Sequence, residues 1–175
     1  LWKEAPRHAA SVHSSVPPEW LRPPATAPSE EWLGYWREAT MPVPEGWGAD
    51  AAVAAVVASL DGDSLVVVGS SGPIRAFERF APVWSDAPRL LANRGLAGID
   101  GTVSTAVGVA LAAGRPALAV MGDVTFLHDA GGLLIGPLER RPDVRIVVIN
   151  DGGGTIFATL EHAGARADCV ERVFT

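Results

Sequence analysis

The chain has 175 residues, of which 48% are hydrophobic, and a formal net charge of −6. An acidic chain with a single lysine is unsuited to binding nucleic acid phosphates, and a single cysteine, Cys169, excludes an internal disulfide and a cysteine-based zinc site. No apolar run approaches the ~18 residues of a membrane span, and no signal-peptide pattern begins the sequence. We therefore expect a cytoplasmic protein with one ordinary domain and an extension.

Residues 1–48 differ in composition from the rest, with eight of the fourteen prolines and five of the six tryptophans. Paired prolines such as Pro17-Pro18 exclude helix across them. Ser29, followed by two glutamates, predicts a short helix that Ser29 caps. We interpret residues 1–48 as an interdomain linker that packs its tryptophans on a neighbouring surface. A disordered leader is the alternative, and so much aromatic area disfavours it.

From residue 49 onward, short β-rich runs alternate with helical segments, as in a parallel sheet with right-handed crossovers. We predict helices at residues 49–60, 73–80, Thr102–Ala113, 129–138 and 156–160, and strands at residues 64–68, 89–92, 117–121 and Val144–Ile149. Residues 170–175 look like a strand that is cut short. The prediction is an α/β domain at residues 49–175, a three-layer doubly wound parallel sheet that is incomplete at its C-terminus.

Two of the predicted strands end in acidic turns, Gly122-Asp123 and Asn150-Asp151-Gly152-Gly153-Gly154. The carboxyl ends of parallel strands share one edge of the sheet, so Asp123 and Asp151 are candidates for one site. Two carboxylates with a carbonyl of the Gly-rich turn form a hard oxygen shell suited to Mg²⁺ on a phosphate. The N–H groups after Gly154 would face the same anion. The alternative is two loop aspartates that cap helices or form turns.

The order of these turns resembles the signature of thiamine-diphosphate enzymes, a Gly-Asp followed by an Asn-Asn-type turn. Val124 stands where many members have Gly, and Asp151 where they have Asn. Three blocks, NRGLAGIDGTVSTAVG at 93–108, GDVTFLHDAGGLLIG at 122–136 and NDGGGTIF at 150–157, resemble the MenD family. Members of that family are 2-succinyl-5-enolpyruvyl-6-hydroxy-3-cyclohexene-1-carboxylate (SEPHCHC) synthases, transferases of menaquinone biosynthesis.

The resemblance implies thiamine diphosphate and Mg²⁺, or Mn²⁺, as cofactors. It places the metal on Asp123, Asp151 and the Gly153 carbonyl, and it makes Ile99 the apolar prop that holds the cofactor in its bent, catalytic shape. By sequence alone, Ile99 is an apolar residue at a loop edge. The other cofactor-binding residues that the resemblance implies are Gly98, Gly122, Val124 and Ile156.

A second group, Ser71, Arg75 and Arg94, lies at or near the turns after two other predicted strands. Ser71 and Arg75 are one helical turn apart, so both can face the cleft above the strand ends. A solvated surface charge is the alternative for each arginine. The resemblance places the three on carboxylates of the substrates, 2-oxoglutarate and isochorismate, because guanidinium groups bind carboxylates bidentately.

Three further residues, Ile156, Phe157 and His128, have two interpretations each. Ile156 and Phe157 would wall the substrate pocket or pack in the core. His128 could transfer a proton, although a structural role is simpler, and Asp129 reads as the N-cap of its own helix.

The family also uses a glutamate in a separate N-terminal pyrimidine-binding domain, usually from another subunit, and no stretch of this chain offers that domain. We therefore expect the chain to be inactive alone and to work in a homodimer or a dimer of dimers. Two other hypotheses remain. One is another thiamine-dependent decarboxylase or carboligase, similar to acetolactate synthase, and the other is an inactive fragment that only binds a partner domain.

Overall fold

We describe the chain from a computed structural model, which covers residue 18, residue 22, residues 29–38, residue 42 and residues 44–93, 98–160 and 164–174. It separates into two units, Leu1–Thr40 and Met41–Thr175. In the first unit, helix α1 spans Glu30–Glu38, and the Ser29 hydroxyl accepts a hydrogen bond from the Trp32 N–H at 3.1 Å. The predicted helix and its serine cap are thus confirmed. The linker role of residues 1–48 stays a prediction.

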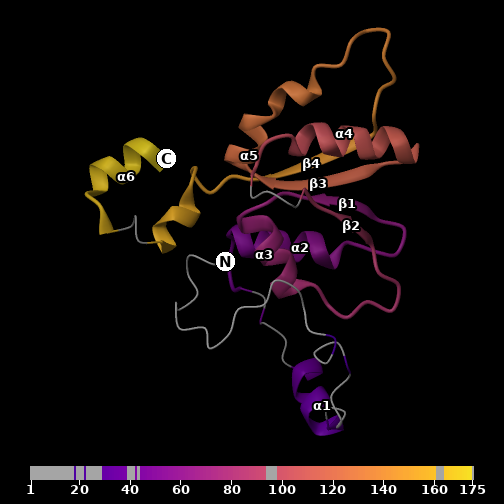
Figure 1. Cartoon of the computed structure of the whole chain (residues 1–175), viewed down its shortest axis with the longest axis vertical. Coiled ribbons are helices and arrows are strands. Elements are labelled where there is room, and N and C mark those ends of the chain that lie inside the picture. Colours follow the sequence, from indigo (N-terminus) through magenta and orange to yellow (C-terminus); the bar gives the residue numbers. More distant parts are fainter. Residues whose placement is uncertain are drawn as a thin grey trace. The chain divides into compact units, whose positions relative to one another are not determined.

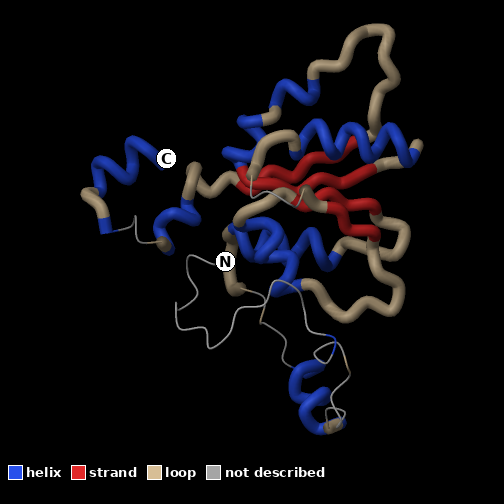
Figure 2. Tube along the Cα trace, in the orientation of Figure 1, coloured by secondary structure: helices blue, strands red, loops and turns tan. Residues whose placement is uncertain are grey.

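The second unit contains a four-stranded parallel sheet in the order β2-β1-β3-β4. Its strands are β1 (Leu65–Val68), β2 (Arg89–Leu91), β3 (Ala117–Gly122) and β4 (Val144–Ile149). Helices α2 (Ala49–Ala58) and α3 (Gly72–Phe80) cover one face, and α4 (Thr102–Ala113) and α5 (Asp123–His128) cover the other (Figure 1). Figure 2 shows the same three layers as red strands between blue helices. The predicted α/β, three-layer fold is confirmed.

Alternate residues of the central strands divide the core into two halves. Val66, Val68 and Val120 pack against α2 and α3 on one face. Val67 and Met121 pack against α4 on the other face. All five side chains are buried, because a parallel strand with helices on both faces has no solvent side. The apolar runs that predicted these strands are therefore continuous rather than alternating.

The connections change direction at one point in the sheet. The chain leaves β1 through α3 to β2 on one side, and then returns through α4 to β3 on the other side of β1. The carboxyl ends of β1 and β3 thus flank a topological switch point, which is where ligands bind in open α/β sheets. At this point the Gly69 N–H donates to the Val120 carbonyl at 2.7 Å. A Cβ on Gly69 would lie 2.9 Å from the Met121 Cβ, so only glycine fits this close approach.

The segment after β3 differs from the prediction. Helix α5 begins directly at Asp123, and a short 3₁₀ helix, η2, follows at Ala130–Leu133 in place of the predicted helix at 129–138. Gly131-Gly132 and, further on, Pro137 explain why a longer helix does not form, since both residue types disfavour helix interiors.

The last two predicted elements also differ. A 3₁₀ helix, η3 (Thr155–Thr159), stands where a helix at 156–160 was expected, and α6 (Ala167–Phe174) replaces the strand predicted at 170–175. Val170, Val173 and Phe174 have the i, i+3, i+4 spacing of one helix face, and Asp168 lies in the first turn. The strand prediction was therefore wrong although the helical signal was present. None of the helices in the described part of the chain is long and apolar enough to cross a membrane.

Candidate functional site

The strand register brings the two acidic turns together. Gly122, the last residue of β3, pairs with Ile149, the last residue of β4. Asp123 therefore follows one strand at the same level at which Asn150 follows the other. The expectation that both turns lie at one edge of the sheet is confirmed.

A hydrogen bond joins the two turns directly. The Asp123 Oδ2 accepts the N–H of Gly153 at 2.8 Å, and its Oδ1 accepts the N–H of Val124 at 2.8 Å. Asp123 is half-buried, whereas Val124 is exposed. The carboxylate thus sets the position of the Gly-rich turn from 30 residues away in the sequence.

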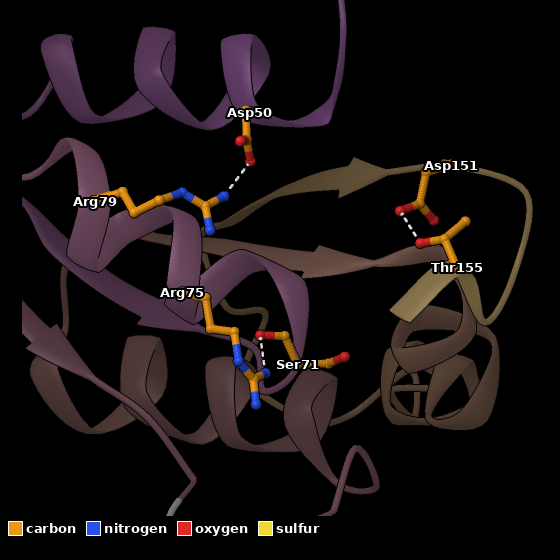
Figure 3. Close-up of polar contacts among 6 residues, drawn as sticks. All are labelled: Asp50, Ser71, Arg75, Arg79, Asp151 and Thr155. Atoms are coloured by element: carbon orange, nitrogen blue, oxygen red, sulfur yellow. Dashed lines mark hydrogen bonds and ion pairs between the residues drawn. The ribbon is translucent and has the colours of Figure 1, made fainter. Parts of the chain in front are cut away.

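The Gly-rich turn has positive backbone φ angles at two positions, a conformation that favours glycine. Gly152 and Gly153 have φ angles of 91° and 107°. Two hydrogen bonds support the turn. The Gly152 N–H donates to the Asn150 side chain at 3.2 Å, and the Asp151 Oδ2 accepts the Thr155 hydroxyl at 2.6 Å (Figure 3). The Thr155 contact fixes the direction of the Asp151 carboxylate.

The N–H groups that follow this turn are engaged within the chain. Gly154 donates to the Phe174 carbonyl at 2.5 Å, and Thr155 donates to the Gly153 carbonyl at 3.0 Å. The expectation that the N–H groups after Gly154 face an anion is therefore wrong for Thr155. The Gly153 carbonyl keeps a second lone pair.

The donor set fits a hard divalent cation. Two carboxylates and one backbone carbonyl supply only oxygen atoms, which Mg²⁺ and Mn²⁺ prefer. Neither Asp123 nor Asp151 forms an ion pair with a described basic side chain. Among the described residues, no group of three or more His, Cys, Asp and Glu side chains could hold a metal by itself. A cation here would therefore need ligands from outside the side chains, such as the carbonyl and phosphate oxygens.

Ile99 lies in the turn before α4, at the carboxyl edge beyond β2. Its side chain is half-buried, and its carbonyl accepts the hydroxyl of buried Thr102 at 3.2 Å. Gly101, with φ of 69°, begins the helix. Thr105 ties this helix start to the end of β2, since its hydroxyl contacts the Gly101 carbonyl at 2.7 Å and the Asn93 side chain at 3.1 Å. Gly98, beside Ile99, is exposed.

Ser71 and Arg75 lie at the switch point, at the start of α3. Ser71 is a non-glycine residue with a positive φ, 74°, at a ψ of −126°. The exposed Arg75 turns back along its helix, and its Nη1 donates to the Ser71 carbonyl at 2.9 Å (Figure 3). Arg94 lies outside the described residues. Strain of this kind collects at functional sites, so Ser71 keeps its place in the candidate site.

Ile156 and Phe157 lie in η3, and both are half-buried. The Phe157 ring stacks on the Phe174 ring of α6 at a centroid distance of 4.3 Å. A Cβ on Gly154 would lie 2.8 Å from the Phe157 ring and 2.9 Å from the Phe174 carbonyl oxygen. Helix α6 therefore packs directly against the Gly-rich turn, which the strand prediction for this segment had not anticipated.

His128 and Asp129 have different environments from those expected. His128 is exposed at the end of α5. Asp129 does not cap its own helix; its carboxylate accepts the N–H of Ser104 at 2.6 Å and the Ser104 hydroxyl at 3.0 Å, in the first turn of α4. A contact between residues 25 positions apart leaves no local pattern, so sequence reasoning missed it.

The family described as "Thiamine pyrophosphate enzyme, C-terminal TPP binding domain" matches residues 75–165, just over half of the chain. This range includes Ile99, Asp123 and the Gly-rich turn. The chain belongs to this family. As a TPP-binding domain it has the cofactor class that the resemblance implied.

Three relatives named 2-succinyl-5-enolpyruvyl-6-hydroxy-3-cyclohexene-1-carboxylate synthase are similar to this TPP-binding domain. The Nocardioides sp. protein is 48% identical over 85% of the chain and 30% of its own length. The Renibacterium salmoninarum protein is 48% identical over 83% of the chain and 27% of its own length. The Rhodococcus erythropolis protein is 52% identical over 75% of the chain and 25% of its own length. The chain thus spans less than a third of each relative.

A solved structure shares the fold of this TPP-binding domain. It is described as a putative thiamin diphosphate-dependent enzyme isolated from Mycobacterium smegmatis. The likeness has a TM-score of 0.50 at 24% sequence identity and covers 62% of the chain and 21% of that protein. At this identity the likeness supports the fold alone.

Proposed function

We propose that this chain is the diphosphate-binding part of an SEPHCHC synthase. The reaction decarboxylates 2-oxoglutarate and adds the resulting succinyl carbanion equivalent to isochorismate. The observation that carries the proposal is the similarity to relatives of this name over most of the chain, with 48% identity over 85% of it in the Nocardioides protein. The direct contact of Asp123 with Gly153 supports the cofactor-binding part of the proposal.

In this proposal Asp123, Asp151 and the Gly153 carbonyl hold Mg²⁺, or Mn²⁺, on the diphosphate of thiamine diphosphate. When bound, the cofactor supplies the stabilisation of a carbanion that no amino-acid side chain provides. Asp123 has two tasks, since one carboxylate binds the metal and also holds the Gly-rich turn through the Gly153 N–H. Thr155 orients Asp151 toward the same ion.

The remaining residues shape the pocket. Ile99 acts as the prop beneath the cofactor, and four other residues line the cofactor: Gly98, Gly122, Val124 and Ile156. Ser71, Arg75 and Arg94 bind carboxylates of the substrates, and Ile156 and Phe157 wall the substrate space. The Arg75 contact with the Ser71 carbonyl is a resting position in which the guanidinium keeps further donors for a carboxylate.

The proposed partner of this chain is a pyrimidine-binding domain with an activating glutamate, in a homodimer or a dimer of dimers. Four leucines of α5 and of the segment between α5 and β4 support such a contact because their side chains are exposed: Leu127, Leu133, Leu134 and Leu138. The cytoplasmic location expected from the sequence stays a prediction.

A completed enzyme tests the proposal. It joins this chain to the parts of the Nocardioides relative that the chain does not cover. We expect metal-dependent binding of thiamine diphosphate, carbon dioxide release from 2-oxoglutarate, and formation of the succinyl product only when isochorismate is present. Turnover of pyruvate in place of 2-oxoglutarate would favour a protein similar to acetolactate synthase. Cofactor binding without turnover of either acid would favour an inactive domain.

A further inference from the structure

Asp129 caps a helix that is distant from it in sequence. The first turn of α4 has a glycine, Gly101, at its N-cap, and this residue has no side chain to accept an N–H. The Asp129 carboxylate takes that role, accepting the Ser104 N–H at 2.6 Å and the Ser104 hydroxyl at 3.0 Å. Hydrogen bonds to an ionised group are stronger than neutral ones, and a negative charge at a helix N-terminus is also favoured by the helix dipole.

The backbone beside Asp129 is fitted to the same contact. A Cβ on Gly132, in η2, would lie 2.6 Å from the Ser104 Oγ and 3.0 Å from its backbone nitrogen. Only glycine allows η2 to lie this close to the first turn of α4. Two features of one segment, a carboxylate and a missing side chain, thus serve the same helix start.

This contact joins the two ends of the candidate cofactor site. On one side, α4 begins after Ile99, whose carbonyl is held by Thr102 of the same first turn. On the other side, Asp129 directly follows α5, whose first residue is Asp123. A short, hydrogen-bonded path therefore runs from the metal ligand to the turn of Ile99.

We propose that Asp129 is a positioning residue that fixes the separation between Asp123 and Ile99. This inference rests on the proposed function, in which Asp123 anchors the diphosphate end of the cofactor and Ile99 supports the bend between its rings. Loss of the Asp129 cap leaves Asp123 and its contact with Gly153 in place but frees the first turn of α4. The anchor is then intact while the prop is displaced.

The test uses the completed enzyme with Asp129→Ala and Asp129→Asn. Asp143→Asn is the matched control, since Asp143 is an exposed carboxylate between η2 and β4. Amide hydrogen exchange without cofactor should show lost protection at Ser104 in Asp129→Ala, partial retention in Asp129→Asn, and no change in the control. Calorimetric titration should give a thiamine diphosphate Kd within about threefold of wild type. Near-ultraviolet circular dichroism of the bound cofactor should change in Asp129→Ala, and kcat should fall by up to about 10²-fold because a misplacement of about 1 Å has that effect.

The outcomes separate the inference from the proposed function. Wild-type kcat and dichroism in Asp129→Ala, despite lost Ser104 protection, would show that the cap is merely structural. A large loss of cofactor affinity would show that the anchor depends on Asp129, which also overturns the inference. If Asp129→Ala does not fold, Ser104→Ala removes one of the two hydrogen bonds and should give a smaller effect of the same kind. A wild-type completed enzyme that binds no thiamine diphosphate would refute the proposed function itself.

Discussion

At the scale of single residues, Asp123 holds the Gly-rich turn through the Gly153 N–H, and we propose that it also binds the metal. Asp123→Asn removes the charge and keeps an oxygen that can accept the Gly153 N–H, whereas Asp123→Ala leaves that half-buried N–H without its partner. In calorimetric titration of the completed enzyme, we expect Asp123→Ala to abolish metal-dependent thiamine diphosphate binding and Asp123→Asn to weaken it, because an amide oxygen can still bind the metal. Only Asp123→Ala should also lose about 1–3 kcal/mol of unfolding free energy.

Asp151→Asn is the companion variant. Its amide oxygen remains a metal ligand and can accept the Thr155 hydroxyl, so we expect a mild effect on cofactor affinity. Unchanged affinity in both Asp123 variants would rule out the metal assignment.

The strained backbone of Ser71 allows its hydroxyl and its conformation to be tested separately. Its φ of 74° costs about 1–3 kcal/mol for a residue with a Cβ, and glycine adopts it freely. We expect Ser71→Gly to raise the free energy of unfolding by about 1 kcal/mol, while Ser71→Ala keeps the strain. If the hydroxyl binds substrate, both variants should raise KM in the completed enzyme to a similar extent. Wild-type KM values in both would remove Ser71 from the substrate site.

Arg75 has a matched control one turn along α3. Arg79 is similarly placed on the helix but forms an ion pair with Asp50 of α2 at 2.5 Å (Figure 3). If Arg75 binds a substrate carboxylate, Arg75→Ala should reduce kcat/KM by the equivalent of about 2–5 kcal/mol with unchanged cofactor affinity. Arg75→Lys should restore only part of it, because an ammonium lacks the planar fork.

Arg79→Ala should leave the kinetics unchanged and cost less than about 1 kcal/mol of stability, since its ion pair is partly exposed. Equal kinetic effects of Arg75→Ala and Arg79→Ala would contradict the substrate role of Arg75.

At the scale of elements, the sequence predicted the bounds of those helices and strands whose ends depend on neighbouring residues. The helix Thr102–Ala113 and the strand Val144–Ile149 were predicted with the bounds that the structure has. Gly101 and Gly114 bound the helix in left-handed conformations, and the strand is a run of β-branched residues with one arginine. Sequence, fold and register also agree on the juxtaposition of the two acidic turns.

The misses have a common cause in long-range packing. The residues of α5, DVTFLH, include β-branched and aromatic types with modest helix propensity. Long-range packing stabilises the helix, since its own Thr125 is buried and its Phe126 packs against the core cluster that contains Met121. The role of Asp129 depends on α4, and the position of the Gly-rich turn depends on α6. No short window of sequence includes both partners of such contacts.

Two glycines of the second unit test how closely its elements approach one another. A Cβ on Gly69 would press on Met121 at the switch point, so Gly69→Ala should lower the free energy of unfolding by about 1–3 kcal/mol. Gly108 lies exposed inside α4, and a Cβ there meets nothing within 4 Å. Gly108→Ala should therefore stabilise the chain by about 0.5–1 kcal/mol. Urea unfolding of both variants checks the contrast, and equal effects would contradict the close approach of β1 to β3.

At the scale of the whole molecule, an exposed apolar segment suggests how the chain joins its partners. Leu134 is 88% exposed and Leu138 is 97% exposed. If the segment forms the contact with a partner domain, Leu134→Asp should weaken assembly of the completed enzyme, as measured by analytical ultracentrifugation. Its stability should change by less than about 0.5 kcal/mol, since the side chain is outside the core.

Val83, which is 93% exposed in the connection between α3 and β2, provides the control. Val83→Asp should leave assembly unchanged. A dimer of wild-type stability in Leu134→Asp would place the partner contact elsewhere.

The return of the chain across β1 also has a kinetic consequence. During synthesis, β1 can pair with β3 only after β2 and α4 have been made. Until then, the four apolar residues of β1, Leu65 to Val68, which are buried in the finished fold, lack one of their two neighbouring strands. Closure of such non-local pairings is slow, and an unpaired apolar strand is open to association with other chains during that interval. The crossing that creates the topological switch point is therefore also the step at which a nascent chain most needs protection. Expression with a chaperone that shields apolar strands should raise the soluble yield.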